Sequence, residues 1–258
     1  MTINTGFTLI DLEKFLMILM RITSFIYIAP FFNMANTPQR VKLGLGIFTA
    51  ALIYMAVPLE LPSYQNLMEY SMIIIKESVT GLLIGFSAYL CSTIIMFAGR
   101  MIDTEIGMSM ATMFDQTLKT QSSLTGGLYN YLLLMMMLVT DMHHFLLKAL
   151  VDTFQLIPIG GIRAEGLQTT LLEFISNYFM IGFRIVIPIF CVTLLVNVIL
   201  GILAKVAPQM NMFAVGIQIK VLVGYAILFL LAGMLPSMAS FIFSNMRDMV
   251  TEVIKGML

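Results

Sequence analysis

The chain is built mainly from six long apolar segments, and nearly every one of them carries charged residues. The segments are expected at about 13–32, 43–57, 71–99, 128–157, 171–204 and 212–236, the last continuing to about 246. The charges inside or beside them are Arg21, Lys76, Glu77, Asp141, Lys148, Glu173, Arg184 and Lys220. A charge at the centre of a bilayer costs about 2.5–3.5 kcal/mol on insertion scales. The pattern predicts membrane-targeted helices that mostly face other protein or a watery lumen, as in one subunit of an assembly around a pore.

Composition narrows the class of protein. Hydrophobic residues make up 59% of the 258 residues and charged residues 11%, against about 25% charged in ordinary soluble domains. The six segments fill the chain, so no separate catalytic domain is expected. Zero net charge without a basic cluster disfavours nucleic-acid binding. Phosphate-loop, H-E-x-x-H and G-x-S-x-G motifs are missing from the sequence. We therefore expect neither an enzyme nor a cofactor.

Two minor features of the sequence carry expectations of their own. Cys91 and Cys191 each lie within an apolar run and are expected to be small buried hydrophobic residues. The first 15 residues have no positive stretch before an apolar core, so no cleaved signal peptide is expected.

The positive charges do not define a membrane orientation. With the N-terminus inside, the inner loops would hold four Lys or Arg residues, and with it outside they would hold five. The segment at 43–57 would reach only about 22 Å as a helix, short of a bilayer core of about 30 Å. Both features would be explained if partner subunits set the position of the chain.

The loop expected at 100–127 is the longest polar break. Its first half is rich in large flexible apolar residues, namely Met108, Met110, Met113 and Phe114, and glycines stand at Gly107, Gly126 and Gly127. Methionine seals irregular gaps and repacks easily. One interpretation is a movable plug across a pore, with the glycine pair as a hinge. The other is an ordinary interfacial loop with a few buried apolar residues.

A polar stripe follows within 128–157. Helical spacing places Asp141, His144, Lys148 and Asp152 on one face. The opposite face would carry Leu146, Leu150, Phe154 and Ile157. The adjacent His143 and His144 weakly suggest a metal site or proton relay, but helical neighbours point about 100° apart. A solvated or partner-facing stripe is the favoured interpretation.

The stretch 204–224 combines a turn with a charge inside a span. Pro208, Gln209 and Asn211 indicate a turn and a helix start. Lys220 lies further along, where it either extends to a polar boundary or makes a specific charge contact, with Glu173 as one potential partner. The residues alone leave both interpretations open.

Three stretches of the sequence, residues 21–58, 98–116 and 207–224, resemble motifs of a known family. Residues 21–58 join an arginine-bearing apolar helix, a proline, a Pro-x-Arg turn and a helix of small residues. Residues 98–116 and 207–224 supply a middle and a late motif, the latter containing Pro208, Asn211, Phe213, Gly216 and Lys220. In order and spacing the chain resembles the FliR family of flagellar export-gate proteins, whose pattern virulence-type secretion homologues share. It departs from that family at Gln116, where proline is frequent, and at residues 141–143, where Asn-Gly-His is frequent.

The resemblance implies an all-α fold of membrane-associated helical hairpins in a helical export-gate assembly. It implies FliP, FliQ, FlhB and FlhA as partners, contact with membrane lipid, and unfolded flagellar proteins as cargo. The location would be the inner membrane, in the flagellar basal body. One domain is expected over 1–258, with three segments and the plug loop in 1–127 and three segments in 128–258.

Two sets of residues have expected roles. By the resemblance, the plug loop of the family lies at about residues 107–127 here, and the cost of a charge in lipid places the charges of the spans at subunit interfaces. The plug and its gating would involve Gly107, Met108, Met110, Met113, Phe114, Asp115, Gly126 and Gly127. Subunit-interface charges would be Arg21, Asp141, His144, Lys148, Asp152, Glu173, Arg184 and Lys220. The alternative function is a secondary transporter or ion channel, which should work alone and show two similar halves. A third is a scaffold, which should tolerate loss of the methionine-rich loop.

Overall fold

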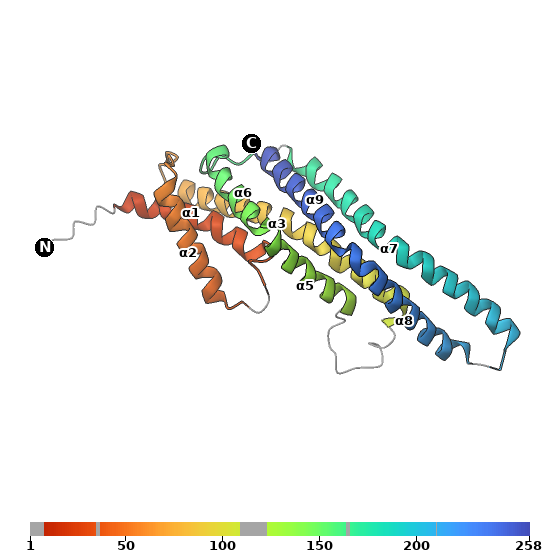
Figure 1. Cartoon of the computed structure of the whole chain (residues 1–258). Helices are drawn as coiled ribbons and strands as arrows, with labels where there is room; N and C mark the ends of the chain where they lie inside the picture. The colour runs from red at the N-terminus through yellow and green to blue at the C-terminus, as the bar shows by residue number, and fades with distance from the viewer. Residues whose placement is uncertain (1–7, 35–36, 109–122, 164–165, 210) are drawn as a thin grey trace. The chain divides into compact units, whose positions relative to one another are not determined.

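The computed structural model describes residues 8–34, 37–108, 123–163, 166–209 and 211–258, and every regular element in these ranges is helical (Figure 1). The elements are α1 (Leu9–Ile28), α2 (Gln39–Ala56), α3 (Leu67–Ile106), α5 (Leu124–Val139), α6 (Met142–Leu156), α7 (Leu167–Val206), α8 (Met212–Leu231), the 3-10 turn η1 (Ala232–Met234) and α9 (Leu235–Gly256). This confirms the predicted all-α class.

The chain forms two compact units, and each draws on several separate stretches of sequence. Unit 1 contains residues 1–91, 137–174 and 243–258, and unit 2 contains 92–136 and 175–242. Both units therefore use residues from either side of position 127. The predicted grouping of 1–127 and 128–258 within one domain stays a prediction.

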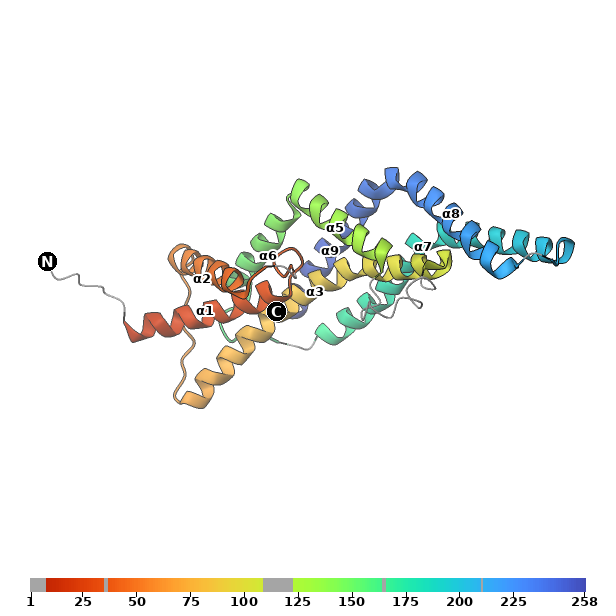
Figure 2. The same ribbon diagram turned by 90° about the horizontal axis from the view of Figure 1, so that it is seen from below.

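Three helical stretches are long and apolar enough to cross a membrane: Leu67–Ile106, Thr169–Val206 and Ala214–Gly256. The pair α5 and α6, bent by 70° at a short break, brings the number to four if it acts as one span (Figure 2). The predicted segments at 13–32 and 43–57 are helices but are not among these candidates. Charges explain the difference, because α1 holds four charged residues and α2 begins with Gln39, Arg40 and Lys42.

The first three helices all begin four residues before their predicted bounds. Thr8 caps α1 through a reciprocal capping box with Asp11, so the helix starts four residues early. It ends at Ile28, four residues before the predicted bound, because Pro30 cannot continue the backbone hydrogen bonds of a helix. The third helix continues to Ile106 through a polar stretch that was predicted to be loop.

The second half also shows departures from the sequence pattern. The predicted continuous segment at 128–157 is broken at Asp141, which adopts a left-handed conformation with φ 54°. In contrast, α7 runs unbroken through Pro188. The last predicted segment is divided by η1 into α8 and α9.

One cysteine does not lie where the sequence predicted. Cys91 is buried as expected, but Cys191 is exposed. The buried positions of α7 in unit 2 recur at Ile181, Ile185, Ile189 and Val196, and Cys191 lies outside that stripe. The Cys191 thiol is exposed because the residue lies outside the buried face of α7, although cysteine itself is apolar.

Candidate functional site

Unit 1 contains a fully buried ion pair between α1 and α3. Arg21 and Glu77 have relative side-chain exposures of 0% and 1%. Arg21 Nε donates to Glu77 Oε2 at 2.6 Å, and Arg21 Nη2 donates to Glu77 Oε1 at 3.0 Å. This two-pronged geometry matches the planar guanidinium to the carboxylate. Arg21, expected at a subunit interface, is instead enclosed by its own chain.

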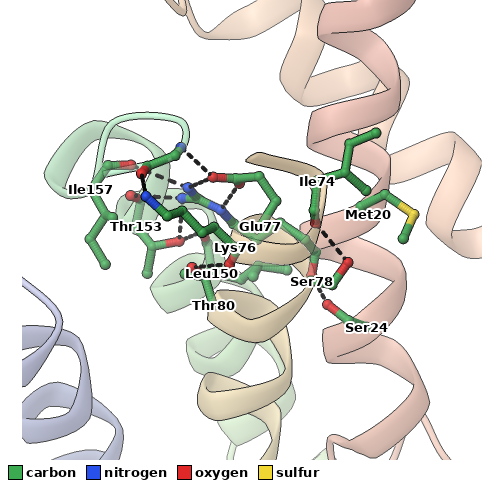
Figure 3. A network of polar contacts seen from close by, with 12 residues as sticks. Met20, Ser24, Ile74, Lys76, Glu77, Ser78, Thr80, Leu150, Thr153 and Ile157 are labelled. Carbon is green, nitrogen blue, oxygen red and sulfur yellow. Dashed lines mark hydrogen bonds and ion pairs between the residues drawn. The ribbon is translucent and has the colours of Figure 1, made fainter. Parts of the chain in front are cut away.

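The rest of the guanidinium is bonded by α6 and the residue after it. Arg21 Nη1 donates to the Thr153 carbonyl at 3.1 Å, and Nη2 donates to the Ile157 carbonyl at 3.3 Å (Figure 3). The guanidinium carbon also lies 4.3 Å from the centre of the Phe154 ring. A buried charge is tolerated only when its donors are satisfied in this way.

Glu77 has a further partner in the turn after α6. The Gly160 N–H donates to Glu77 Oε1 at 2.8 Å, and Lys76 Nζ donates to the Gly160 carbonyl at 3.4 Å. Gly160 has φ 77°, a conformation that glycine adopts without the cost of a side chain. The network therefore joins α1, α3, α6 and the turn at 158–161.

Two glycines allow α3 to approach α1 closely enough for this pair. A Cβ atom on Gly81 would lie 1.9 Å from the Arg21 carbonyl oxygen, and one on Gly85 would lie 2.9 Å from the Phe25 carbonyl oxygen. Glu77, Gly81 and Gly85 are four residues apart, so they share one helical face. This small-residue spacing is typical of close helix packing in membranes.

A second polar cluster joins α1 to α2. Tyr54 OH donates to Asp11 Oδ1 at 2.8 Å, and Thr8 N and Oγ1 donate to Asp11 Oδ2 at 2.9 and 2.7 Å. The backbone N–H of Thr8, then its hydroxyl, then Tyr54 hold the pKa of Asp11 below its usual value. The same hydrogen bond to Asp11 raises the pKa of Tyr54. This cluster strengthens the start of α1 and its contact with α2.

Unit 2 contains an anchor at the base of the predicted plug loop. Ser123 Oγ donates to Asp103 Oδ2 at 2.7 Å, and the Thr125 N–H lies 3.3 Å from both Asp103 oxygens. Ser123 Oγ in turn accepts the Gly126 N–H at 2.8 Å. The buried carboxylate on α3 thus supports the first turn of α5, whose N-terminus favours negative charge.

Backbone packing reinforces this anchor. A Cβ atom on Gly99 would lie 2.2 Å from the Gly126 Cα atom, so only glycine fits where α3 meets α5. Gly127 has no atom within 4 Å of an added Cβ. Both Gly126 and Gly127 lie inside α5. The predicted glycine hinge is therefore helical, and one of its members is packed tightly.

The predicted plug residues are only partly described. Gly107 follows the last residue of α3 with φ 90°, and the Met108 sulfur accepts a hydrogen bond from Tyr225 OH at 3.6 Å. Met110, Met113, Phe114 and Asp115 lie outside the described residues. The plug role stays a prediction.

The predicted stripe on α6 is exposed. Asp141, His144, Lys148 and Asp152 are all exposed, whereas Leu146, Leu150, Phe154 and Ile157 on the opposite side are buried. Asp141 occupies the N-cap position of α6 without a side-chain capping hydrogen bond, so it lies at the break and not inside the helix. The two faces are as predicted, and whether a partner or the lumen covers the polar face stays a prediction.

The remaining predicted charges differ in burial. Glu173 and Arg184 are exposed on α7, and Lys220 is half-buried on α8. Arg184 lines a mainly apolar cavity of about 270 Å³ in unit 2, together with Pro188 and Met234. The proposed Lys220–Glu173 contact stays a prediction.

The late motif defines the start of α8. Asn211 Oδ1 accepts the Ala214 N–H at 3.4 Å as the cap, and Pro208 lies in the preceding turn. Gly216 is buried, with the Leu200 Cδ1 atom 3.3 Å from the position of an added Cβ. Phe213 is helical, but its side chain lies outside the described features. The motif therefore positions α8 against α7.

Sequence reasoning missed several of these residues. Glu77 was recognised as a charge near a span, but its pairing with Arg21 was not predicted, and Asp103 was assigned to a loop. A useful signal was available in the spacing of Glu77, Gly81 and Gly85. Small residues at four-residue intervals mark the face where another helix can approach an acidic side chain.

Comparison with known proteins shows the family to which the chain belongs. The profile of the bacterial export proteins, family 1, matches residues 12–246. The flagellar biosynthetic protein FliR of Bacillus subtilis (strain 168) is 30% identical over 226 residues, covering 86% of this chain and 87% of the relative. FliR of Pectobacterium carotovorum subsp. carotovorum is 29% identical, covering 91% and 90%, and FliR of Escherichia coli (strain K12) is 28% identical, covering 92% and 90%. The chain therefore belongs to family 1 of the bacterial export proteins.

Proposed function

We infer that the chain is a FliR-type subunit of the flagellar type III protein export apparatus, located in the inner membrane. The observation that carries this function is the family match over residues 12–246, together with relatives that cover most of the chain. Three or four helical stretches suited to a membrane agree with that location. The role is that of a structural channel component and not of a catalyst.

The partners are the other gate subunits. We propose that α7 and α8 pack against FliP and FliQ, with FlhB and FlhA attached to the assembly. Arg184 supports this because it is exposed near the middle of a 40-residue apolar helix. Leaving it in lipid would cost about 2.5–3.5 kcal/mol, which a carboxylate or carbonyl of a partner would offset. Membrane lipid would cover the faces that the partners leave free.

The methionine-rich loop is the proposed plug of the channel. Its composition suits a seal that must open for each cargo chain, because methionine packs adaptably. The bonds from Ser123 and Thr125 to Asp103 favour a loop whose base is held to α3. Opening would then involve the middle of the loop and not a hinge at Gly126 and Gly127.

The role in the apparatus is tested by purification from native membranes. The untagged partners that accompany this chain should be identified by mass spectrometry, and FliP and FliQ should be among them. A chain that purifies without them and transports ions when reconstituted alone in vesicles would instead support the transporter alternative.

The plug is tested by membrane conductance. Deleting residues 110–122 should leave the assembly intact but let small ions pass. A gate with Asp103→Ala should let fewer ions pass than a gate with the deletion, because the substitution releases only the base of the loop. Asp248→Asn, at an exposed position of α9, removes one carboxylate elsewhere and should leave assembly and conductance unchanged as the control. If the deleted gate assembles and stays closed to ions, the seal lies in another subunit.

A further inference from the structure

The break between α5 and α6 gathers three potential metal ligands. The chain has two histidines, His143 and His144, and both lie directly after this break. One ligand atom from each of them and one from Asp141 lie within 4.8 Å of one another. Two imidazoles and a carboxylate are a donor set that late first-row divalent metals prefer.

The broken helix explains how neighbouring residues converge. Asp141 has a left-handed backbone, and its Oδ1 lies 3.2 Å from His144 Nδ1. The ring centres of His143 and His144 are 4.1 Å apart. The expectation that adjacent histidines diverge by about 100° therefore does not prevent their rings from meeting here.

The surroundings of His143 orient it as a ligand. Its Nδ1 lies 3.3 Å from the Met137 carbonyl, and its ring centre is 5.3 Å from that of Phe31. A carbonyl accepts a proton from imidazole and cannot donate one, so Nδ1 carries the hydrogen and Nε2 keeps its lone pair. Ring nitrogens of metal-binding histidines are commonly fixed by such a bond on the opposite nitrogen.

We propose that Asp141, His143 and His144 bind one late first-row divalent metal ion, with Zn²⁺ as the best match to three such ligands. Water or a group from a partner would complete the tetrahedron. The ion would hold the α5–α6 break in its bent form. The N-terminal dipole of α6 opposes a cation, but its effect is small beside the free energy of metal coordination.

The test uses the full chain purified in detergent with an affinity tag that contains no histidine. Calorimetric titration with ZnCl₂ should give one site per chain. His144→Gln and Asp141→Asn should each raise the dissociation constant by roughly tenfold or more. Titration with Co²⁺ should give visible absorption bands of tetrahedral coordination, which His144→Gln abolishes.

Matched controls separate this site from other donors. Asp152→Asn removes a carboxylate from the same exposed face, and Cys191→Ala removes an exposed thiol. Both should bind Zn²⁺ as the unaltered chain does. His144 is exposed, so its replacement should leave the thermal unfolding of the metal-free protein unchanged.

Three results would overturn the proposal. The first is an unaltered chain that does not bind Zn²⁺ at micromolar concentration. The second is equal affinity in His144→Gln, and the third is loss of binding in Cys191→Ala. Because His144→Gln leaves the half-buried His143 in place, the decision does not depend on a variant that disturbs folding.

Discussion

Two arginines in apolar helices illustrate opposite ways of placing a charge. Arg21, in unit 1, is fully buried and donates to Glu77 and to two carbonyls of its own chain. Arg184, in unit 2, is exposed beside an apolar cavity. The charge of Arg21 is thus neutralised within unit 1, whereas no ion pair is found for Arg184 among the described residues. The contrast separates a charge that its own unit satisfies from a charge that its own unit leaves exposed.

The long helices also differ in the share of their residues that the chain itself buries. In the most apolar window of α3, 56% of residues are buried, against 28% in the window of Thr169–Val206 and 11% in that of Ala214–Gly256. Apolar surface that the chain does not bury must be covered by lipid or by other protein. In these windows the later helices therefore leave more apolar surface uncovered by the chain than α3 does.

The largest expected effect comes from breaking the buried ion pair. Glu77→Gln leaves Arg21 buried without its counter-charge, which should lower the free energy of unfolding by about 3–5 kcal/mol. Thermal unfolding in detergent measures the loss. The double replacement of Arg21 and Glu77 by Met and Leu should be less damaging than Glu77→Gln alone, because no buried charge remains. Unchanged unfolding of Glu77→Gln would remove the contrast between the two regions.

The next effect concerns the packing at the base of the plug loop. Gly126→Ala places a Cβ atom 2.6 Å from Ser123 Oγ and 3.1 Å from the Met96 carbonyl oxygen. We expect a loss of about 1–3 kcal/mol in the free energy of unfolding. Gly127→Ala is the matched control, because its added Cβ atom has no other atom within 4 Å. This substitution should be neutral or should stabilise the helix by up to about 1 kcal/mol. Equal damage from both would instead support a hinge at the pair.

A smaller effect on the free chain is expected for the exposed arginine. Arg184→Leu should change the free energy of unfolding by no more than about 0.5 kcal/mol, because the side chain is exposed and makes no hydrogen bond or ion pair with the described residues. Co-purification with FliP and FliQ should nevertheless decrease, and Lys220→Met should weaken assembly or export in the same way. Full assembly and motility of both variants would show that these charges are incidental.

The smallest expected effect is a dependence of stability on pH. It comes from Asp11, which lies at the start of α1 and accepts a hydrogen bond from Tyr54 of α2. The pKa of Asp11 is lowered in the folded chain, so the carboxylate stabilises the fold above its usual pKa. That contribution is lost as the pH falls through the lowered value. When helical content is measured as the pH is lowered, the unaltered chain should therefore lose its helices at a lower pH than Asp11→Asn. Superimposed curves would show that the cluster does not contribute.

Local residues alone determined much of this protein. Long apolar runs predicted helices, and three motifs indicated the family that the comparisons confirmed. The exposed and buried faces of α6 also followed from spacing, because a helix repeats every 3.6 residues whatever surrounds it. Such features depend on neighbours within a few positions of the chain.

Tertiary structure decided what distant residues do to one another. Arg21 and Glu77 are 56 residues apart, and they meet because glycine lets two backbones approach. Asp103 is helical and buried, and Ser123 and Thr125 supply its hydrogen bonds across 20 and 22 residues. A charge in an apolar run requires a partner on energetic grounds, but only the packing of helices selects which partner it is.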